Sequence, residues 1–167
     1  MASITLYFVS GNEVISRVIR AAEMGFAYSH VGARGVDGTL ISAHMTGGVA
    51  ARAPDSEDPW TVWADVSIPC TNAQAVSFWA FLESQIGKPY DMGAIWDMAG
   101  SVLEAKQSRS GPVDAWFCSE LQLAALQFAR FFPWLPAPLR TVTPQDLFYM
   151  VAGLPGATMT PRAVGAV

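Results

Sequence analysis

Apolar residues in the first half of the chain follow the pattern of strands. Residues 4–9 are apolar almost without interruption, which predicts a strand that is buried on both faces. Segments 29–35 and 39–44 flank an Asp-Gly pair, and this arrangement is a strong signal for a hairpin. Alternating positions over 60–68 predict another strand, which we expect to end at Pro69. The first half is therefore expected to form a small antiparallel sheet.

Helical spacing dominates the second half of the chain. Residues 75–86 repeat apolar positions at helical intervals behind a capping box at Thr71. Thr143 followed by Pro144 indicates another helix start, because proline is favoured at the first helical position. The strongest periodicity runs over 121–132 and predicts a helix of the core. Its apolar stripe comprises Leu121, Ala124, Ala125, Phe128 and Phe132.

A chain of 167 residues has the size of one domain, since domains of roughly 100 to 200 residues are the norm. Two weaker helical patterns, over 14–22 and 92–104, join the stronger segments without a linker or an internal repeat. Beyond Gly153 the chain is rich in Gly, Pro and Ala, so residues 154–167 are expected to be a loosely ordered tail. We therefore predict a single α+β domain over 1–167, with the sheet packed against helices.

Composition excludes several classes of function. The chain has 10 Lys and Arg against 14 Asp and Glu, and the basic residues are scattered, so nucleic acid is not an expected partner. No apolar run reaches the roughly 18 to 20 residues of a membrane-spanning helix. The first residues lack the charged start of a signal peptide, so a cytoplasmic location is expected, with export by another route left open. The sequence leaves the oligomeric state undetermined.

The chain has two cysteines, and only Cys118 has surroundings that favour chemistry. It lies three residues before Leu121, in the first turn of the helix whose apolar stripe runs over 121–132, on the side that faces the core. A helix N-terminus stabilises a thiolate, and its amides are ready donors for the oxyanion of an acyl-transfer intermediate. The alternative, with equal weight on this evidence alone, is that Cys118 is a buried small apolar residue. Cys70, beside Pro69 at a strand end, is expected to be structural.

Both histidines of the chain fall in the predicted hairpin. If the connection is the three-residue loop 36–38, with Gly38 in the left-handed conformation, then His30 pairs with His44 and the two share one face. A two-residue turn would place His44 on the opposite face, because a slip of one residue reverses the direction of every side chain. Whether His30 and His44 lie on the same face therefore depends on the length of the turn.

A nucleophile and its base need a third polar group that holds the imidazole in the correct tautomer. His44 and Ser42 are the candidates for this role beside His30. Zinc held by Cys118 and the two histidines is a weaker alternative, because no carboxylate is obviously placed to orient the ligands. We therefore predict neither a metal nor a cofactor. Two carboxylates have simpler assignments, as a first-turn residue and as a helix cap: Glu120 and Asp91.

Several short segments, spread over most of the chain, combine a histidine strand, a Gly-Lys-Pro-Tyr-Asp motif and a cysteine helix. In order and spacing they resemble the circularly permuted NlpC/P60 proteins of the YiiX/YebB-like group. The resemblance implies a papain-like fold, permuted so that the histidine strands precede the cysteine helix, and thiol chemistry on amide or ester bonds. The segments are 28–32 (Tyr-Ser-His-Val-Gly), 40–43 with 47–49, 87–91, 116–121 (Trp-Phe-Cys-Ser-Glu-Leu) and 143–147.

One departure from this group concerns the third polar group. These proteins commonly carry Glu-Ala where this chain has Ser42-Ala43, so the usual orienting carboxylate is missing. His44, two residues further along the same strand face, is the candidate substitute; otherwise the site is a dyad. By analogy with the group, Tyr90 is a candidate residue that lines the site, and Ser42 and Ser119 are two further candidates.

The leading hypothesis is a cysteine hydrolase, a peptidase or amidase with Cys118 as nucleophile and His30 as base. Its substrate would be a peptide, a peptidoglycan fragment or an acyl lipid, in a bacterial or phage setting. A lipid acyltransferase and a non-catalytic module that binds lipid or peptide are the alternatives, since the missing glutamate and the 6 tryptophans permit binding without chemistry. A third, weaker hypothesis is a structural component, such as a phage protein, that keeps the fold without the catalytic activity.

Overall fold

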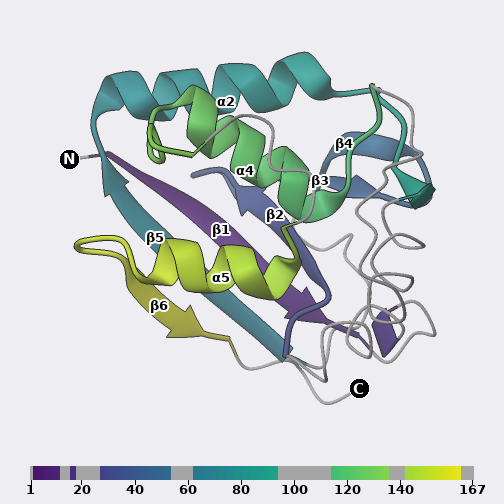
Figure 1. Ribbon diagram of the computed structural model, residues 1–167, viewed down its shortest axis with the longest axis horizontal. Helices are drawn as coiled ribbons and strands as arrows, with labels where there is room; N and C mark the ends of the chain where they lie inside the picture. Colours follow the sequence, from purple (N-terminus) through teal and green to yellow (C-terminus); the bar gives the residue numbers. More distant parts are fainter. Residues whose placement is uncertain are drawn as a thin grey trace.

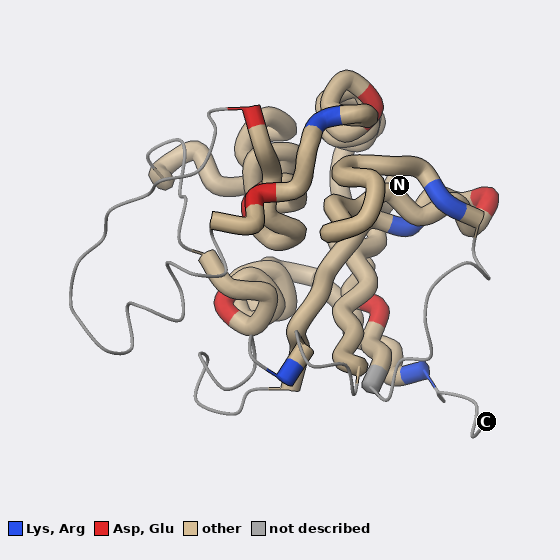
Figure 2. Tube along the Cα trace, turned by 90° about the vertical axis from the view of Figure 1, so that its right-hand side faces the viewer, with Lys and Arg blue, Asp and Glu red and all other residues tan. Residues whose placement is uncertain are grey.

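The computed structural model describes residues 2–11, 16–17, 27–53, 62–93, 114–135 and 142–162. The helices predicted over 14–22 and 92–104 lie almost entirely outside these residues. Within the described residues no helix is long and apolar enough to cross a membrane. Charged residues are scattered over the described chain and no basic stripe gathers on the face shown in Figure 2.

The chain folds around one antiparallel sheet of six strands in the order β4-β3-β2-β1-β5-β6. β1, the long strand predicted from the first apolar run, lies at the centre and pairs with β2 and β5 (Figure 1). The predicted α+β class with an antiparallel sheet is confirmed. The strands are β1 (Ala2–Ser10), β2 (His30–Arg34), β3 (Leu40–His44), β4 (Gly48–Arg52), β5 (Val62–Cys70) and β6 (Thr158–Pro161).

Three helices of the described chain pack together against one face of this sheet: α2 (Asn72–Gln85), α4 (Cys118–Phe128) and α5 (Pro144–Ala152) (Figure 1). Two of them begin with a capping box: the one at Thr71 is predicted from the sequence, and at Thr143 the predicted helix start is confirmed and is also a capping box. The Thr71 hydroxyl accepts from the N–H of Gln74, and the Thr143 hydroxyl accepts from the N–H of Asp146. These boxes satisfy first-turn amides and fix where each helix begins.

The loop between β2 and β3 has the geometry that brings the histidines to one face. Ala33 lies opposite Ile41, and the three-residue loop ends at Gly38, whose φ of 88° is in the left-handed region. Continuing this register along the hairpin places His30 opposite His44. The three-residue loop is therefore confirmed, and the alternative two-residue turn is wrong.

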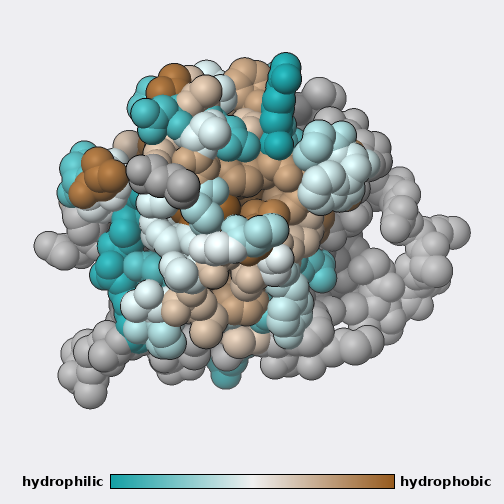
Figure 3. All heavy atoms as spheres, turned by 90° about the vertical axis from the view of Figure 1, so that its left-hand side faces the viewer, coloured by the Kyte–Doolittle hydropathy of each residue, from teal (hydrophilic) through white to brown (hydrophobic). Residues whose placement is uncertain are grey.

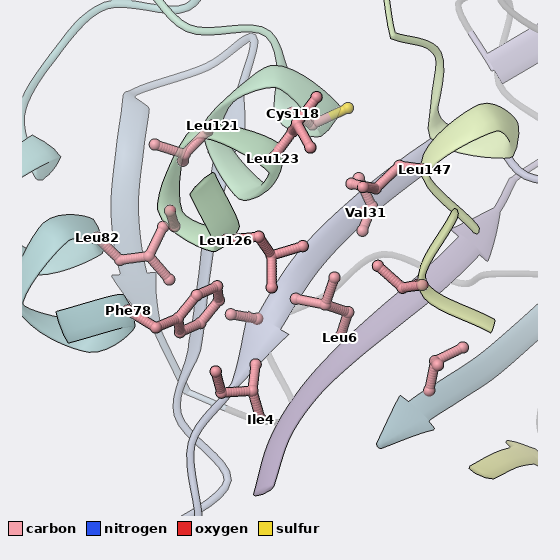
Figure 4. Close-up of a cluster of buried hydrophobic side chains, with 14 of the residues drawn as sticks. Ile4, Leu6, Val31, Phe78, Leu82, Cys118, Leu121, Leu123, Leu126 and Leu147 are labelled. Carbon is pink, nitrogen blue, oxygen red and sulfur yellow. The ribbon is translucent and has the colours of Figure 1, made fainter. Parts of the chain in front are cut away.

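The face of the sheet that meets the helices, here called the helix face, is apolar. Leu6 and Val31 contribute to it from the strands, while Phe78, Leu121 and Leu126 contribute from α2 and α4 (Figure 4). All of these side chains are fully buried. Burial of such surface contributes about 25 cal/mol per Å² and is the main favourable term in folding.

The opposite face of the sheet, here called the second face, combines apolar and polar groups. Tyr7, Val9 and Leu40 form a small buried cluster there, with Trp63 packed against it. The guanidinium of Arg34 lies 5.1 Å from the centre of the Trp63 ring. Because successive residues of a strand point to opposite faces, each strand supplies both the apolar helix face and this mixed face.

Two details of the strands differ from the sequence prediction. β5 continues through Pro69, which lies opposite Ser3 of β1, instead of ending before it. β6 accompanies β5 only as far as Ser67, so proline occupies a part of the strand where the missing N–H breaks no pairing with β6. In the segment expected to be a loosely ordered tail, residues 158–161 form β6. Cross-strand pairing with β5 orders this part of the chain.

Phe128 does not face the core as the helical stripe predicts. Its side chain is 60% exposed, whereas Leu121 and Ala125 of the same stripe are fully buried. It lies at the last turn of α4, where its ring contacts Phe81 of α2 (centroids 5.4 Å apart) at the margin of the core.

On the face of the molecule shown in Figure 3, apolar groups gather at the centre, between hydrophilic margins.

Candidate active site

The two histidines form a pair at the end of the hairpin that is remote from its loop. His30 is the first residue of β2 and His44 is the last residue of β3. The centres of their rings are 4.6 Å apart, with 44° between the ring planes. His30 is 8% exposed and His44 is partly buried. The structure therefore brings together the two imidazoles that the sequence analysis singled out.

A hydrogen-bonded chain holds His44 on the second face. The Tyr7 hydroxyl donates to Ser42 Oγ at 3.0 Å, and Ser42 Oγ lies 2.5 Å from His44 Nε2. Tyr7 and Ser42 are fully buried, so this chain is shielded from water. Ser42, a candidate for the third role, thus contacts the other candidate, His44, directly.

Gly32 makes room for this chain. It lies opposite Tyr7 on the neighbouring strand, and a Cβ atom at Gly32 would overlap the Tyr7 ring and hydroxyl. The phenol therefore crosses over β2 to reach Ser42 on β3. Tyr7 is not predicted as a site residue, because in the sequence it is one more residue of a buried strand. Gly32, a glycine inside a strand, is the sequence signal for a close approach of another group to the backbone.

Cys118 is the first residue of α4 and is fully buried. The residue before it, Phe117, is the N-cap and has no side-chain oxygen to accept from the first-turn amides. An N-terminal amide group of a helix carries partial positive charge, which favours an anion at this position. The side chain of Cys118 begins at the edge of the apolar cluster, and its sulfur points away from the leucines (Figure 4).

α4 packs directly on the histidine hairpin. Gln122, one turn after Cys118, donates from Nε2 to the carbonyl of Ile41 at 3.0 Å. α4 contacts both β2 and β3 and runs in the direction of β2, so that it begins on the side of the molecule where β2 begins (Figures 1 and 4). Cys118, the first residue of α4, and His30, the first residue of β2, therefore lie toward the same end of these two elements.

Acidic and phenolic groups surround the start of α4. Burial raises the pKa of Tyr90 well above its ordinary value, and the negative potentials of Cys118, Glu120 and Asp91 raise it further. Asp91 is 1% exposed and Glu120 is 5% exposed, which their assignments as helix cap and first-turn residue do not predict. Tyr90, expected to line the site, is thus an electrostatic neighbour of Cys118.

The remaining candidates lie elsewhere. Ser119 does not face the histidines through its hydroxyl, which donates to the carbonyl of Val142 at 2.5 Å. Cys70 lies at the end of β5, and burial raises the pKa of its thiol, with a smaller opposing contribution from the backbone of Ala75. The structure therefore separates the two cysteines into different regions.

The described residues do not offer a metal site of the expected kind. No group of three His, Cys, Asp or Glu side chains in this part of the chain could hold a metal ion. The zinc alternative required Cys118, His30 and His44 to converge, and they are not such a group.

Among the comparisons with known proteins, the one with solved structures supports the fold. No known protein family matches the sequence, and no curated protein matches it. A solved structure has a similar fold. That structure is the crystal structure of the metalloprotein YiiX from Escherichia coli O157:H7, with a TM-score of 0.63 and 18% identity. The similarity covers 93% of this chain and 94% of that chain.

Proposed function

We propose that this chain is a thiol-dependent hydrolase in which Cys118 is the nucleophile and His30 is its base. The observation that carries the proposal is the position of Cys118 as the buried first residue of α4, on the helix that packs against the histidine hairpin. Thiolate formation is favoured at such a position, and an imidazole is the usual base for a cysteine nucleophile.

The reaction divides into two acyl transfers. His30 takes the proton of the Cys118 thiol, and the sulfur attacks the carbonyl carbon of an amide or ester. First-turn amides of α4 donate to the oxyanion of the tetrahedral intermediate. The bond to the leaving amine or alcohol breaks, and this group receives the proton from His30. Water, deprotonated by His30, then releases the acid and regenerates the thiol.

Ser42 and Tyr7 support this reaction through His44. Because the Tyr7 hydroxyl donates to Ser42 Oγ, the proton of Ser42 is available to His44 Nε2, and all three groups are paired when His44 is neutral and protonated at Nδ1. The neutral ring then packs against His30 without adding a charge next to it. In this proposal the hydrogen-bonded series of Tyr7, Ser42 and His44 takes the orienting role that a carboxylate fills in the permuted NlpC/P60 group.

The order of the elements supports a permuted papain-like domain. The histidine strands β2 and β3 precede the cysteine helix α4, as the resemblance to the permuted NlpC/P60 group implies. The shared fold with YiiX supports the same grouping at the level of architecture. We extend the proposal to substrates with an amide or ester bond, of which peptides, peptidoglycan fragments and acyl lipids are the classes to assay.

The first test is the ionisation of Cys118. In a Cys70→Ala background, the ultraviolet absorbance of the thiolate reports a single thiol and does not require a reagent to reach the buried sulfur. We expect an apparent pKa below about 7, compared with about 8.5 for an ordinary thiol. His30→Ala should move it toward the ordinary value, and Cys118→Ser should abolish the signal.

The opposite result is equally clear. A titration near about 8.5 that His30→Ala leaves unchanged would overturn the thiol pair. A titration as expected, followed by acyl transfer to an added amine at the expense of hydrolysis, would assign the chain to the acyltransferases instead.

A further inference from the structure

Three hydrogen bonds converge on the start of α5 from two distant parts of the chain. Ser119, next to the candidate nucleophile, donates to the carbonyl of Val142 at 2.5 Å. Gln145 Oε1 accepts from the N–H groups of Ala27 at 3.0 Å and Tyr28 at 3.4 Å, just before the strand that begins with the candidate base. Residues 142–145 are therefore bonded to the start of α4 and to the segment that leads into β2.

These contacts are buried. Ser119 is 0% exposed and Gln145 is 3% exposed. A buried donor or acceptor that loses its partner costs more than a hydrogen bond contributes when it is made, so these bonds are strongly favoured. The segment after Tyr28 is fixed in turn, because the N–H of Ser29 donates to the carbonyl of Val9 on β1.

The start of α5 is itself stiff. Thr143 and Asp146 form a reciprocal capping box, and Pro144 fixes the backbone at the first helical position. Leu147, in the same first turns, joins the helix-face cluster and points toward Val31 of β2 (Figure 4). Because this stiff segment is hydrogen-bonded to the start of α4 and to the segment before β2, it holds the two at a fixed separation.

We infer that Ser119 and Gln145 are positioning residues, and that the start of α5 is a bracket that sets the distance and orientation of Cys118 relative to His30. The inference rests on the proposed function. Neither residue touches the reacting atoms; each acts by holding the backbone next to a residue that does. Small misplacements of reacting groups matter, because a shift of about 1 Å can cost about 100-fold in rate.

The experiment compares variants of the bracket with a matched variant at the start of another helix, α2. Gln145→Leu removes the acceptor of two N–H groups, and Ser119→Ala removes the donor to Val142. The control, Gln74→Leu, removes the capping amide at the start of α2 and leaves the start of α5 and all three bracket bonds in place. Gln145→Glu is the rescue, because its carboxylate oxygen can accept the same two bonds.

The readouts are the apparent pKa of Cys118, measured as the thiolate absorbance in a Cys70→Ala background, and its rate of alkylation by iodoacetamide at neutral pH, each in variants whose circular dichroism is native. For Gln145→Leu and Ser119→Ala we expect the pKa to move toward that of the His30→Ala variant and the rate to fall by about 10- to 100-fold. Gln145→Glu should recover most of the rate, and Gln74→Leu should leave both quantities unchanged.

Two failures can be told apart. If His30→Ala shifts the pKa but the bracket variants behave like Gln74→Leu, the bracket is overturned while the thiol pair stands. If His30→Ala shifts nothing, the proposed function itself fails. Should Gln145→Leu not fold, Ser119→Ala decides the inference by the same two readouts.

Discussion

The two faces of the central sheet are both buried but are built on different chemistry. On the helix face, Leu6 and Val31 fill space against α4 and make no directional contacts. On the second face, Tyr7 and Ser42 are equally buried, yet each makes a hydrogen bond of defined geometry. Neighbouring residues of one strand, such as Leu6 and Tyr7, belong to different faces because side chains alternate.

The difference separates two kinds of constraint. An apolar face tolerates exchange among residues of similar volume, since its stability comes from filled space and area removed from water. A buried polar chain tolerates little exchange, because a lost partner leaves an unsatisfied group in a medium of low dielectric. Substitutions of the aliphatic residues on the helix face should therefore change the free energy of unfolding alone, whereas those in the polar chain of the second face should also change the tautomer of His44.

The largest effect is expected on the helix face. Leu126→Ala should lower the free energy of unfolding by about 2 to 5 kcal/mol, because it removes buried area and leaves a cavity. Denaturant unfolding measures the loss. Phe128→Ala is the matched control on the same helix, since its side chain is 60% exposed, and it should cost less than about 1 kcal/mol. Equal costs at the two positions would contradict the assigned faces of α4.

Gly32→Ala should destabilise the protein by about 1 to 3 kcal/mol, because the added methyl group overlaps the Tyr7 ring. The cost should shrink in a Tyr7→Leu background, where the ring is absent. Thermal and denaturant unfolding of the two single variants and the double variant gives the coupling energy. Strict additivity of the two substitutions would show that Gly32 does not serve the Tyr7 contact.

Ser42→Ala should cost about 1 to 2 kcal/mol, because it leaves the buried Tyr7 hydroxyl without its acceptor. It should also release His44 from one tautomer, which NMR of the imidazole nitrogens detects as a change in protonation between Nδ1 and Nε2. Tyr7→Phe should leave the contact between Ser42 and His44 in place and so preserve the tautomer. A tautomer that survives Ser42→Ala would argue against the hydrogen-bonded chain as its cause.

The smallest effect is expected at Tyr90, beside the start of α4, where buried polar groups meet the helix face. Its pKa is raised in the folded protein, chiefly by burial. A phenol with a raised folded pKa contributes stability that is fully present below about pH 10, the unfolded value, and is lost as the pH rises through the folded value. Tyr90→Phe should therefore flatten the alkaline decline in stability.

Urea unfolding at neutral and alkaline pH tests this expectation. At neutral pH the phenol is neutral in both states, so any difference between Tyr90 and Phe there reflects packing and the hydroxyl, and serves as the baseline. An alkaline slope that is identical in the two proteins would mean that Tyr90 titrates as it does in the unfolded chain.

The sequence by itself determined the features that depend on neighbouring residues. The loop that ends at Gly38 fixes the register of the hairpin, so the pairing of His30 with His44 follows from local turn chemistry and the two-residue period of strands. The capping boxes at Thr71 and Thr143 are equally local, and the structure contains both. The start of α4 at Cys118 follows from helical spacing.

Only the tertiary structure decided which distant residues meet. Tyr7 reaches Ser42, 35 residues away, because β1, β2 and β3 are neighbours in the sheet and Gly32 lies between them. Gln145 bonds to Tyr28 across 117 residues, and Asp91 is buried where its sequence neighbours suggest a simple cap. Periodicity records which side of an element is apolar, but not which element lies opposite. Long-range polar contacts therefore leave little local signal, since each residue's choice of partner is made by the packing of the whole chain.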